Sequence, residues 1–179
     1  ALTTVSGPEM FRYWLQGGRI TIGFLAAAQI DKYGNINTTV VGDYHKPKVR
    51  LPGGGGAPEI AISCGEIFIT ARHQKRVFVD KLDFITSLGH GPNGEGRAAF
   101  GVHTKGPTKL ITDLCVMEPD PETLAFTVAS LHPGVTREAV RDETGWSVAF
   151  ADSVEETPPP TDEELTVLRD LQARTKAAH

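Results

Sequence analysis

The chain has 179 residues and a mass of 19.3 kDa, enough for one well-packed domain. Apolar residues make up 40% and charged residues 22%, which is typical of a folded protein and excludes a disordered chain. The formal charge of −4 argues against a general nucleic-acid binder and against a polybasic membrane anchor. The longest apolar run, residues 22–28, is far shorter than the roughly 20 residues of a membrane helix, and no secretory signal is recognisable. We therefore expect a cytoplasmic protein.

The first third of the chain predicts one helix and two strands. Residues 8–15 start with a proline and place apolar side chains on one face, which favours a helix ending at Gly17-Gly18. Residues 19–28 form an apolar run with little alternation, which predicts a strand buried on both faces. A turn at residues 32–35 leads to a second strand at residues 36–41, and residues 42–56 are expected to be irregular.

The middle of the chain predicts a helix followed by short strands. Proline and apolar spacing after four consecutive glycines indicate a helix starting at Ala57. Short strands are expected at residues 66–70, 76–79 and 84–87, and residues 89–106 are rich in glycine and predict a mobile surface loop.

The last third predicts a hairpin and two helices. Residues 108–116 and 124–129 flank a proline-containing turn, which favours a hairpin. Thr136 is suited to cap a helix that stops at Gly145, and residues 146–151 form a short strand. After a stiff spacer at residues 158–160, a capping box at residues 161–164 begins a last helix, whose apolar stripe is Leu165, Leu168 and Leu171. We divide the chain into a domain at residues 1–157 and a spacer with a C-terminal helix at residues 158–179.

The four glycines at positions 53–56 are the sharpest local feature. Successive glycines leave backbone N–H groups uncovered, and a following helix directs its dipole to the same place, which suits a phosphate, a carboxylate or an oxyanion. No Gly-Lys-Ser/Thr follows, so the segment is not a P-loop. A flexible loop without a ligand explains the same residues equally well.

Two basic segments and two cysteines are weaker signals. Residues 43–50 could hold the phosphates or the carboxylate of an acidic ligand, and His73, Lys75 and Arg76 form a second basic cluster, but for each residue alone a solvated surface is the simpler interpretation. Cys64 and Cys115 lie among apolar neighbours and are interpreted as small buried side chains. The histidines show no close ligand pair, so we expect no metal.

Taken in order, these pieces resemble a known family. The residues that carry the resemblance are Ala27-Ala28-Gln29-Ile30-Asp31, Tyr33-Gly34-Asn35-Ile36-Asn37, Gly42-Asp43-Tyr44-His45, Pro47-Lys48, Gly53-Gly54-Gly55-Gly56-Ala57, His73, Lys75-Arg76, Leu131-His132-Pro133-Gly134-Val135-Thr136 and Glu143-Thr144-Gly145-Trp146. Their order is similar to that in the β subunit of family I CoA-transferases, and most similar to the β subunit of the glutaconate CoA-transferases. The match runs from about residue 19 to residue 146.

The resemblance implies an α/β fold with a largely parallel open sheet and flanking helices. It implies coenzyme A as a substrate held as a thioester, with no metal, and a homologous α subunit as partner, with no nucleic acid and no membrane. In such enzymes a glutamate attacks an acyl-CoA to give an anhydride, CoA thiolate returns to form a glutamyl-CoA thioester, and a second carboxylic acid accepts the CoA. The resemblance assigns Gly53, Gly54, Gly55, Gly56 and Ala57 to CoA binding, with the amides of Gly56 and Ala57 at the thioester. Asp43, His45 and Lys48 are candidate substrate-binding residues.

One motif of the family is absent. The catalytic glutamate belongs to a Glu-Ser-Gly or Glu-Asn-Gly motif upstream of the glycine loop, and residues 1–53 contain no such motif. We therefore expect the N-terminal part of the subunit to be a further partner, without which the chain is inactive. A related hydrolase or decarboxylase, and a non-catalytic subunit that binds an acidic ligand, stay open as alternatives.

Overall fold

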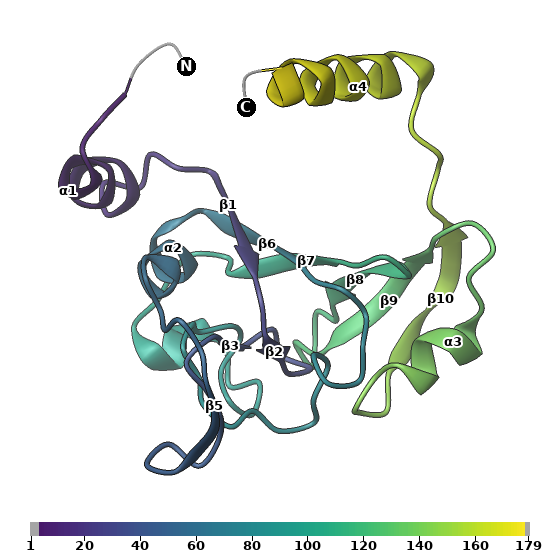
Figure 1. The fold of residues 1–179 in the computed structure, drawn as a ribbon. Coiled ribbons are helices and arrows are strands. Elements are labelled where there is room, and N and C mark those ends of the chain that lie inside the picture. The colour runs from purple at the N-terminus through teal and green to yellow at the C-terminus, as the bar shows by residue number, and fades with distance from the viewer. Residues whose placement is uncertain (1–3, 178–179) are drawn as a thin grey trace.

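The computed structural model describes residues 4–177, whose strands and helices are labelled in Figure 1. The main element is a six-stranded sheet with the order β1-β6-β7-β8-β9-β10, and two two-stranded sheets, β2-β3 and β4-β5, lie beside it. The strands are β1 Ile22–Ala26, β2 Gln29–Ile30, β3 Ile36–Asn37, β4 Val40–Gly42, β5 Pro47–Arg50, β6 Glu66–Thr70, β7 Pro107–Ile111, β8 Cys115–Pro119, β9 Phe126–Leu131 and β10 Ala149–Glu156. The helices are α1 Gly7–Glu9, η1 Met10–Leu15, α2 Ala57–Ser63, η2 Arg97–Phe100, α3 Arg137–Asp142 and α4 Asp162–Ala177.

The pairing in the main sheet is mixed but mostly parallel. β1, β6 and β7 run parallel, and β10 runs parallel to β9, whereas β8 is antiparallel to both of its neighbours. The α/β class expected from the sequence is confirmed, with helices flanking the sheet. The expected helix at residues 8–15 is also confirmed. It consists of α1 followed directly by the π-helix η1.

The core lies against one face of the main sheet. Its centre consists of strand side chains that are nearly or fully buried, and α2 and α3 pack there through Ala61 and Val140. The strand members of this core are Leu25, Ile67, Ile69, Leu110, Met117 and Val128. These side chains alternate with residues on the opposite face, as the pleat of a strand requires.

Strand β1 departs from the prediction that it is buried on both faces. Exposed and buried residues alternate along it, and Phe24 is 66% exposed although its ring packs edge-on against Phe68 at a centroid distance of 5.6 Å. β1 is an edge strand, and among residues 4–177 no helix covers the face that carries Phe24. Parallel strands are ordinarily covered on both faces. β1 therefore has the apolar composition of a buried strand, although one of its faces is exposed among residues 4–177.

Several short strands predicted from apolar composition are wrong. Residues 76–79 and 84–87 contribute only isolated bridges at Phe78 and Ser87. The loop at residues 89–106 contains η2 and the buried Arg97, so it is tied to the body. Phe78 enters the core from irregular backbone, whereas Phe84 and Ile85 are exposed. Composition alone does not separate either situation from a strand.

Two predicted strands are each divided by a polar side chain. The strand expected at residues 36–41 becomes β3 and β4 because Asn37 Oδ1 accepts the amides of Thr39 and Val40. The strand expected at residues 108–116 becomes β7 and β8 because Thr112 Oγ1 accepts the amides of Leu114 and Cys115 and reverses the chain. Short polar side chains compete in this way with the backbone hydrogen bonds between strands.

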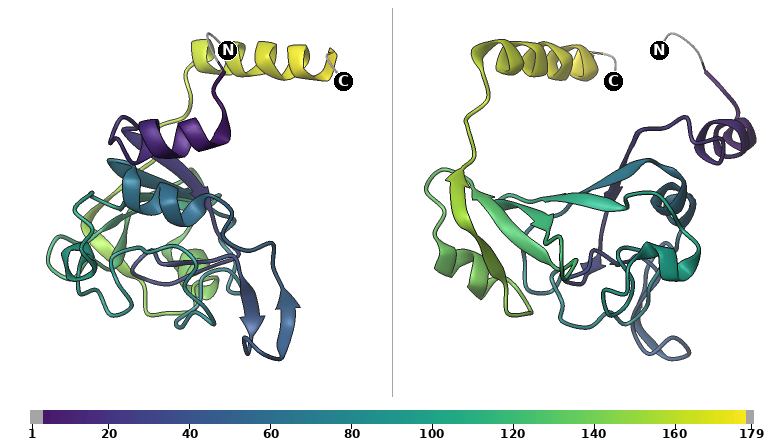
Figure 2. Two further views of the ribbon diagram at one scale, coloured as in Figure 1. Left: turned by 90° about the vertical axis from the view of Figure 1, so that its left-hand side faces the viewer. Right: turned by 180° about the vertical axis from the view of Figure 1, so that it is seen from behind.

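The C-terminal helix forms as predicted but packs differently. The capping box is confirmed: the Thr161 amide donates to Glu164 Oε2 at 2.7 Å, and the Glu164 amide donates to Thr161 Oγ1 at 3.2 Å. Figure 2 shows α4 standing off the body at the end of an extended linker. Leu168 and Leu171 are about half exposed, so the predicted apolar stripe has no partner among the described residues.

Candidate functional site

The glycine segment forms a loop that leads into α2, as the sequence predicts. Gly53 anchors it, because its amide donates to the Thr38 carbonyl and its own carbonyl accepts from Thr38 Oγ1, both at 2.9 Å. Gly53 and Gly55 have φ values of +98° and +50°, which side chains rarely adopt. Gly56 is different, since its φ is −88°. Its need for glycine must have another cause.

That cause is Phe11 of η1. A Cβ atom at Gly56 would lie 2.4 Å from Cζ of Phe11, so any side chain at this position would force the ring or the loop to shift. Phe11 is partly buried and packs on the core beside Ala57 and Ile60. The predicted N-terminal helix therefore holds the glycine loop in place.

Three amides of the loop have no hydrogen-bond acceptor among the described residues. Within residues 4–177, the N–H groups of Gly54, Gly55 and Gly56 donate to no protein acceptor, whereas the Ala57 amide donates to the Gly54 carbonyl at 2.9 Å. The expectation that the Ala57 amide faces a ligand is therefore not supported by this geometry, because a turn uses that donor. Uncovered neighbouring amides at a helix start form a concave donor surface suited to an anion.

The loop lies at the edge of the sheet where ligands are usually found. Only two residues separate the end of α2 from the start of β6, so the start of α2 points to the carboxyl ends of β1 and β6. Ligands of open parallel sheets generally bind outside these ends. The loop is thus placed by the β1–α2–β6 crossover.

The predicted substrate residues lie elsewhere, at the tip of the β4–β5 hairpin. Asp43, His45 and Lys48 are all exposed. Asp43 Oδ1 accepts the amides of His45 and Lys46 at 2.9 and 2.8 Å, which closes the tip. Figure 1 shows this hairpin projecting from the body, so the structure does not bring these three residues together with the glycine loop.

His73 is not part of an exposed basic cluster, contrary to the sequence prediction. Its side chain is 3% exposed and stacks on Phe78 at a ring distance of 3.9 Å. The ring nitrogens contact Thr112 Oγ1 at 3.2 Å and Thr144 Oγ1 at 2.9 Å. Burial lowers the pKa of His73 to about 4, so the ring is neutral. The ring therefore joins Thr112, directly after β7, to Thr144, which follows α3.

The motif at residues 29–37 forms a buried polar network, and its residues Asp31, Lys32 and Tyr33 also line a cavity of about 440 Å³. Asp31 is buried, and its Oδ1 accepts the amides of Tyr33 and Asn35 at 3.0 Å each. Asn35 then joins the turn to the glycine-rich loop, since its Nδ2 donates to the Gly91 carbonyl and its Oδ1 accepts the Gly89 amide. Burial raises the pKa of Asp31, and the hydrogen bonds that its carboxylate accepts from Asn35 and Tyr33 oppose that shift.

Arg97 is a buried residue whose role the sequence did not indicate. Its guanidinium donates to the carbonyls of Ala61, Leu88, Gly89 and Thr104 and to Thr104 Oγ1. Ala61 belongs to α2, so the arginine joins that helix to the glycine-rich loop. Among the residues that the structure describes, no three His, Cys, Asp or Glu side chains gather into a metal-binding group.

The sequence model of the family described as "Coenzyme A transferase" matches residues 2–143. The chain belongs to the coenzyme A transferase family. It is 61% identical over 177 residues to the β subunit of 3-oxoadipate CoA-transferase from Pseudomonas knackmussii, covering 99% of this chain and 68% of that relative. It is 38% identical to the β subunit of glutaconate CoA-transferase from Acidaminococcus fermentans, covering 86% of this chain and 58% of the relative. The resemblance to family β subunits is therefore confirmed.

Solved structures of the family have the same fold. The crystal structure of glutaconate coenzyme A-transferase from Acidaminococcus fermentans matches with a TM-score of 0.76 and 34% identity, over 88% of this chain and 60% of that chain. Rhodococcus jostii IpdAB also matches with a TM-score of 0.76, at 30% identity, over 91% of this chain and 64% of that chain. The chain thus spans about three fifths of the solved subunits. Within residues 4–177, no helix has the length and apolarity needed to cross a membrane.

Proposed function

We propose that the chain is the glycine-loop part of a CoA-transferase β subunit that moves CoA between an acyl-CoA and a carboxylic acid. The observation that carries this proposal is the 61% identity, over nearly the whole chain, to the 3-oxoadipate CoA-transferase β subunit. The same relative favours a dicarboxylate of the 3-oxoadipate type as the acid. Coenzyme A is then a substrate, and the division into residues 1–157 and 158–179 separates the catalytic fold from its C-terminal helix.

The proposed role of the loop is to hold the thioester and its developing charge. When a carboxylate attacks the thioester carbonyl, negative charge grows on the carbonyl oxygen before the C–S bond breaks and CoA thiolate leaves. Donors already in place for that charge stabilise the transition state. The amides of Gly54, Gly55 and Gly56 are such donors, because no protein acceptor among residues 4–177 uses them.

The attacking carboxylate is proposed to come from outside this chain. The first two carboxylates after the loop have local partners: Glu59 accepts from Ser63 Oγ and Glu66 accepts from Thr108 Oγ1, each at 2.7 Å. The part of the subunit that this chain does not span is proposed to supply the nucleophile, and a homologous α subunit to complete the site. The open edge of β1 and the exposed Phe24 support such partners, because uncovered edges and apolar faces are ordinarily protected.

The test is CoA transfer by a reconstituted complex of this chain, the remaining part of the subunit and the α subunit. Labelled CoA is expected to move from an acyl-CoA to 3-oxoadipate, and the chain alone is expected to be inactive. Gly56→Val keeps its backbone N–H, but its side chain would clash with Phe11 and displace the loop. Misplacing one oxyanion donor typically costs about 2.7–4 kcal/mol, so kcat should fall about a hundredfold or more. Release of free CoA without transfer would assign the chain to hydrolysis instead. Lys48→Ala tests the expectation that Asp43, His45 and Lys48 bind substrate.

A further inference from the structure

The β4–β5 hairpin, residues 40–50 (hereafter the arm), carries an exposed aromatic tip. Tyr44 is 48% and Val49 50% exposed, and the Tyr44 ring stacks on Phe84 at a centroid distance of 5.5 Å. The Arg50 guanidinium lies 5.0 Å from the centre of the same ring, and its Nη2 donates to the Tyr44 carbonyl at 2.9 Å. Tyrosine and arginine held in one geometry are the residues that most often anchor protein interfaces.

The arm is also positively charged within an acidic chain. It contains Lys46, Lys48 and Arg50 against one carboxylate, Asp43, which gives a net charge of +2, whereas the whole chain has a charge of −4. Among residues 4–177, none of these three cations forms an ion pair. A projecting two-stranded hairpin is only marginally stable by itself, so an acidic surface that receives its tip would stabilise it.

Such a surface lies on the uncovered face of the main sheet, across β8, β9 and β10. A cavity of about 360 Å³ lies there, and we call it the acidic hollow. Its strand residues include Thr127, Ala129, Ala149 and Ala151, whose small side chains leave space for a large one.

The rim of the acidic hollow is negatively charged. The lining carboxylates are Glu118, Asp120 and Asp152; Lys109 pairs with Glu118, which leaves a net charge of −2. The amide of Thr123 lowers the pKa of Asp120, which is therefore ionised at neutral pH. Small residues beneath an acidic rim complement an aromatic tip surrounded by cations.

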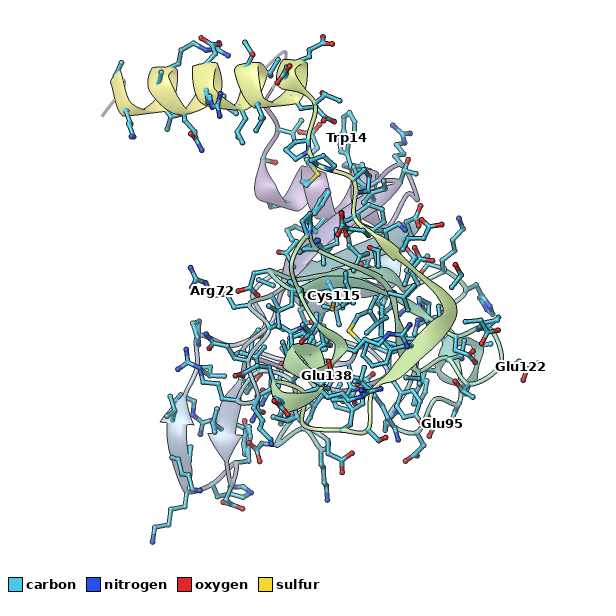
Figure 3. The ribbon with its side chains drawn as sticks, turned by 90° about the vertical axis from the view of Figure 1, so that its right-hand side faces the viewer. Trp14, Arg72, Glu95, Cys115, Glu122 and Glu138 are labelled. Carbon is cyan, nitrogen blue, oxygen red and sulfur yellow. The ribbon has the colours of Figure 1, made fainter. Side chains whose placement is uncertain are left out.

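The two surfaces cannot meet within one chain. Figure 3 shows the arm at the lower left and Glu122, in the turn that follows the rim residue Asp120, at the opposite side of the molecule. We propose that the arm of one copy inserts Tyr44 and its neighbouring cations into the acidic hollow of a second copy. Because the two surfaces differ, the contact is head-to-tail, and it forms either a closed ring or a longer array.

The test is sedimentation velocity of the chain over a range of concentrations, with substitutions in each surface. Wild type is expected to associate beyond 19.3 kDa. Lys48→Glu and Asp152→Lys should each raise the dissociation constant about tenfold. An equimolar mixture of the two variants should recover association, because the unaltered arm of one variant meets the unaltered acidic hollow of the other and the two altered surfaces carry opposite charges. Ala149→Trp should abolish association by filling the acidic hollow. Lys176→Glu on α4 is the matched control and should change nothing.

Four results would overturn the proposal. A wild-type chain that stays monomeric at every concentration is one. Association that survives Lys48→Glu, Asp152→Lys and Ala149→Trp is another, because it would point to the apolar face around Phe24. A mixture of the charge variants that does not recover is the third. The fourth is weaker binding of CoA by Lys48→Glu with unchanged association, which would make the arm a ligand-binding element. Circular dichroism establishes that each variant is folded. None of these readouts depends on CoA transfer.

Discussion

His73 makes the stability of this fold depend on pH in a way that can be worked out from its surroundings. The ring is buried against Phe78 and contacts two threonine hydroxyls, and Thr144 Oγ1 itself donates to the Val140 carbonyl at 2.6 Å. Burial therefore lowers the pKa of His73 from 6.5 to about 4, although the carboxylates of Asp113 and Glu143 oppose the shift.

The sign and size follow from proton linkage. Between pH 6.5 and 4 the unfolded chain binds a proton at His73 and the folded chain does not, so stability is full above pH 6.5 and falls as the pH drops. One pKa unit corresponds to about 1.36 kcal/mol, so the loss at pH 4.5 is about 2–3 kcal/mol. Burial also lowers the pKa of His90, which adds to the slope in the same direction.

The assay is urea unfolding at several pH values between 7.5 and 4.5. His73→Gln keeps hydrogen-bonding groups but does not titrate, so its free energy of unfolding should fall by about 2–3 kcal/mol less than that of wild type across this range. His45→Gln, at the exposed tip of the arm, is the control and should follow wild type. Identical pH profiles for wild type and His73→Gln would refute the reasoning.

Three further substitutions test the packing around the site. Gly56→Ala should lower the free energy of unfolding by about 1–3 kcal/mol, because the new methyl group clashes with the Phe11 ring. In a Phe11→Ala background the same substitution should cost at least about 0.5 kcal/mol less. Strictly additive effects of the two substitutions would contradict this. Arg97→Met should cost at least about 3 kcal/mol in the same measurement, since several buried carbonyls lose their donor, whereas Lys105→Met should stay within about 0.5 kcal/mol. Leu168→Asn should also change the free energy of unfolding by less than about 0.5 kcal/mol; a larger loss would show that α4 packs on the body.

The elements that the sequence predicts well depend on local chemistry. The strand at Glu66–Thr70, the start of α2 at Ala57 and the capping box of α4 all follow from neighbouring residues, and each forms where the pattern places it. The Thr136 cap of α3 is a further example, since its side chain accepts the Ala139 amide. Caps, glycine runs and proline positions act over three or four residues.

The features that the sequence does not reveal depend on distant contacts. In the sequence, His73 resembles part of a surface cluster, but in the fold its ring hydrogen-bonds to Thr144, 71 residues away. Arg97 looks like one more charge in a loop, and only the fold brings it to the carbonyl of Ala61. Similarly, the apolar composition of β1 predicts burial on both faces, and the structure shows that residues 4–177 cover only one.

The candidate site was predictable in part for the same reason. The glycine loop and its following helix are local and appear as expected, whereas the engagement of the Ala57 amide by Gly54 depends on how the turn closes. The family motif at residues 29–37 is recognisable in the sequence, but its work as a buried polar support depends on contacts between Asn35 and Gly91. A motif therefore locates the site, and the geometry shows which of its groups are available to a ligand.

The most direct measurement is mass spectrometry of the reconstituted complex after incubation with an acyl-CoA and no acceptor acid. We expect CoA to become attached as a thioester to a glutamate outside this chain, and a later addition of 3-oxoadipate to remove it. Digestion should show residues 1–179 unmodified. A CoA adduct on Glu59 or Glu66, or consumption of the acyl-CoA with no adduct on any component of the complex, would contradict the proposal that this chain contributes the glycine loop and the remaining part of the subunit contributes the nucleophile.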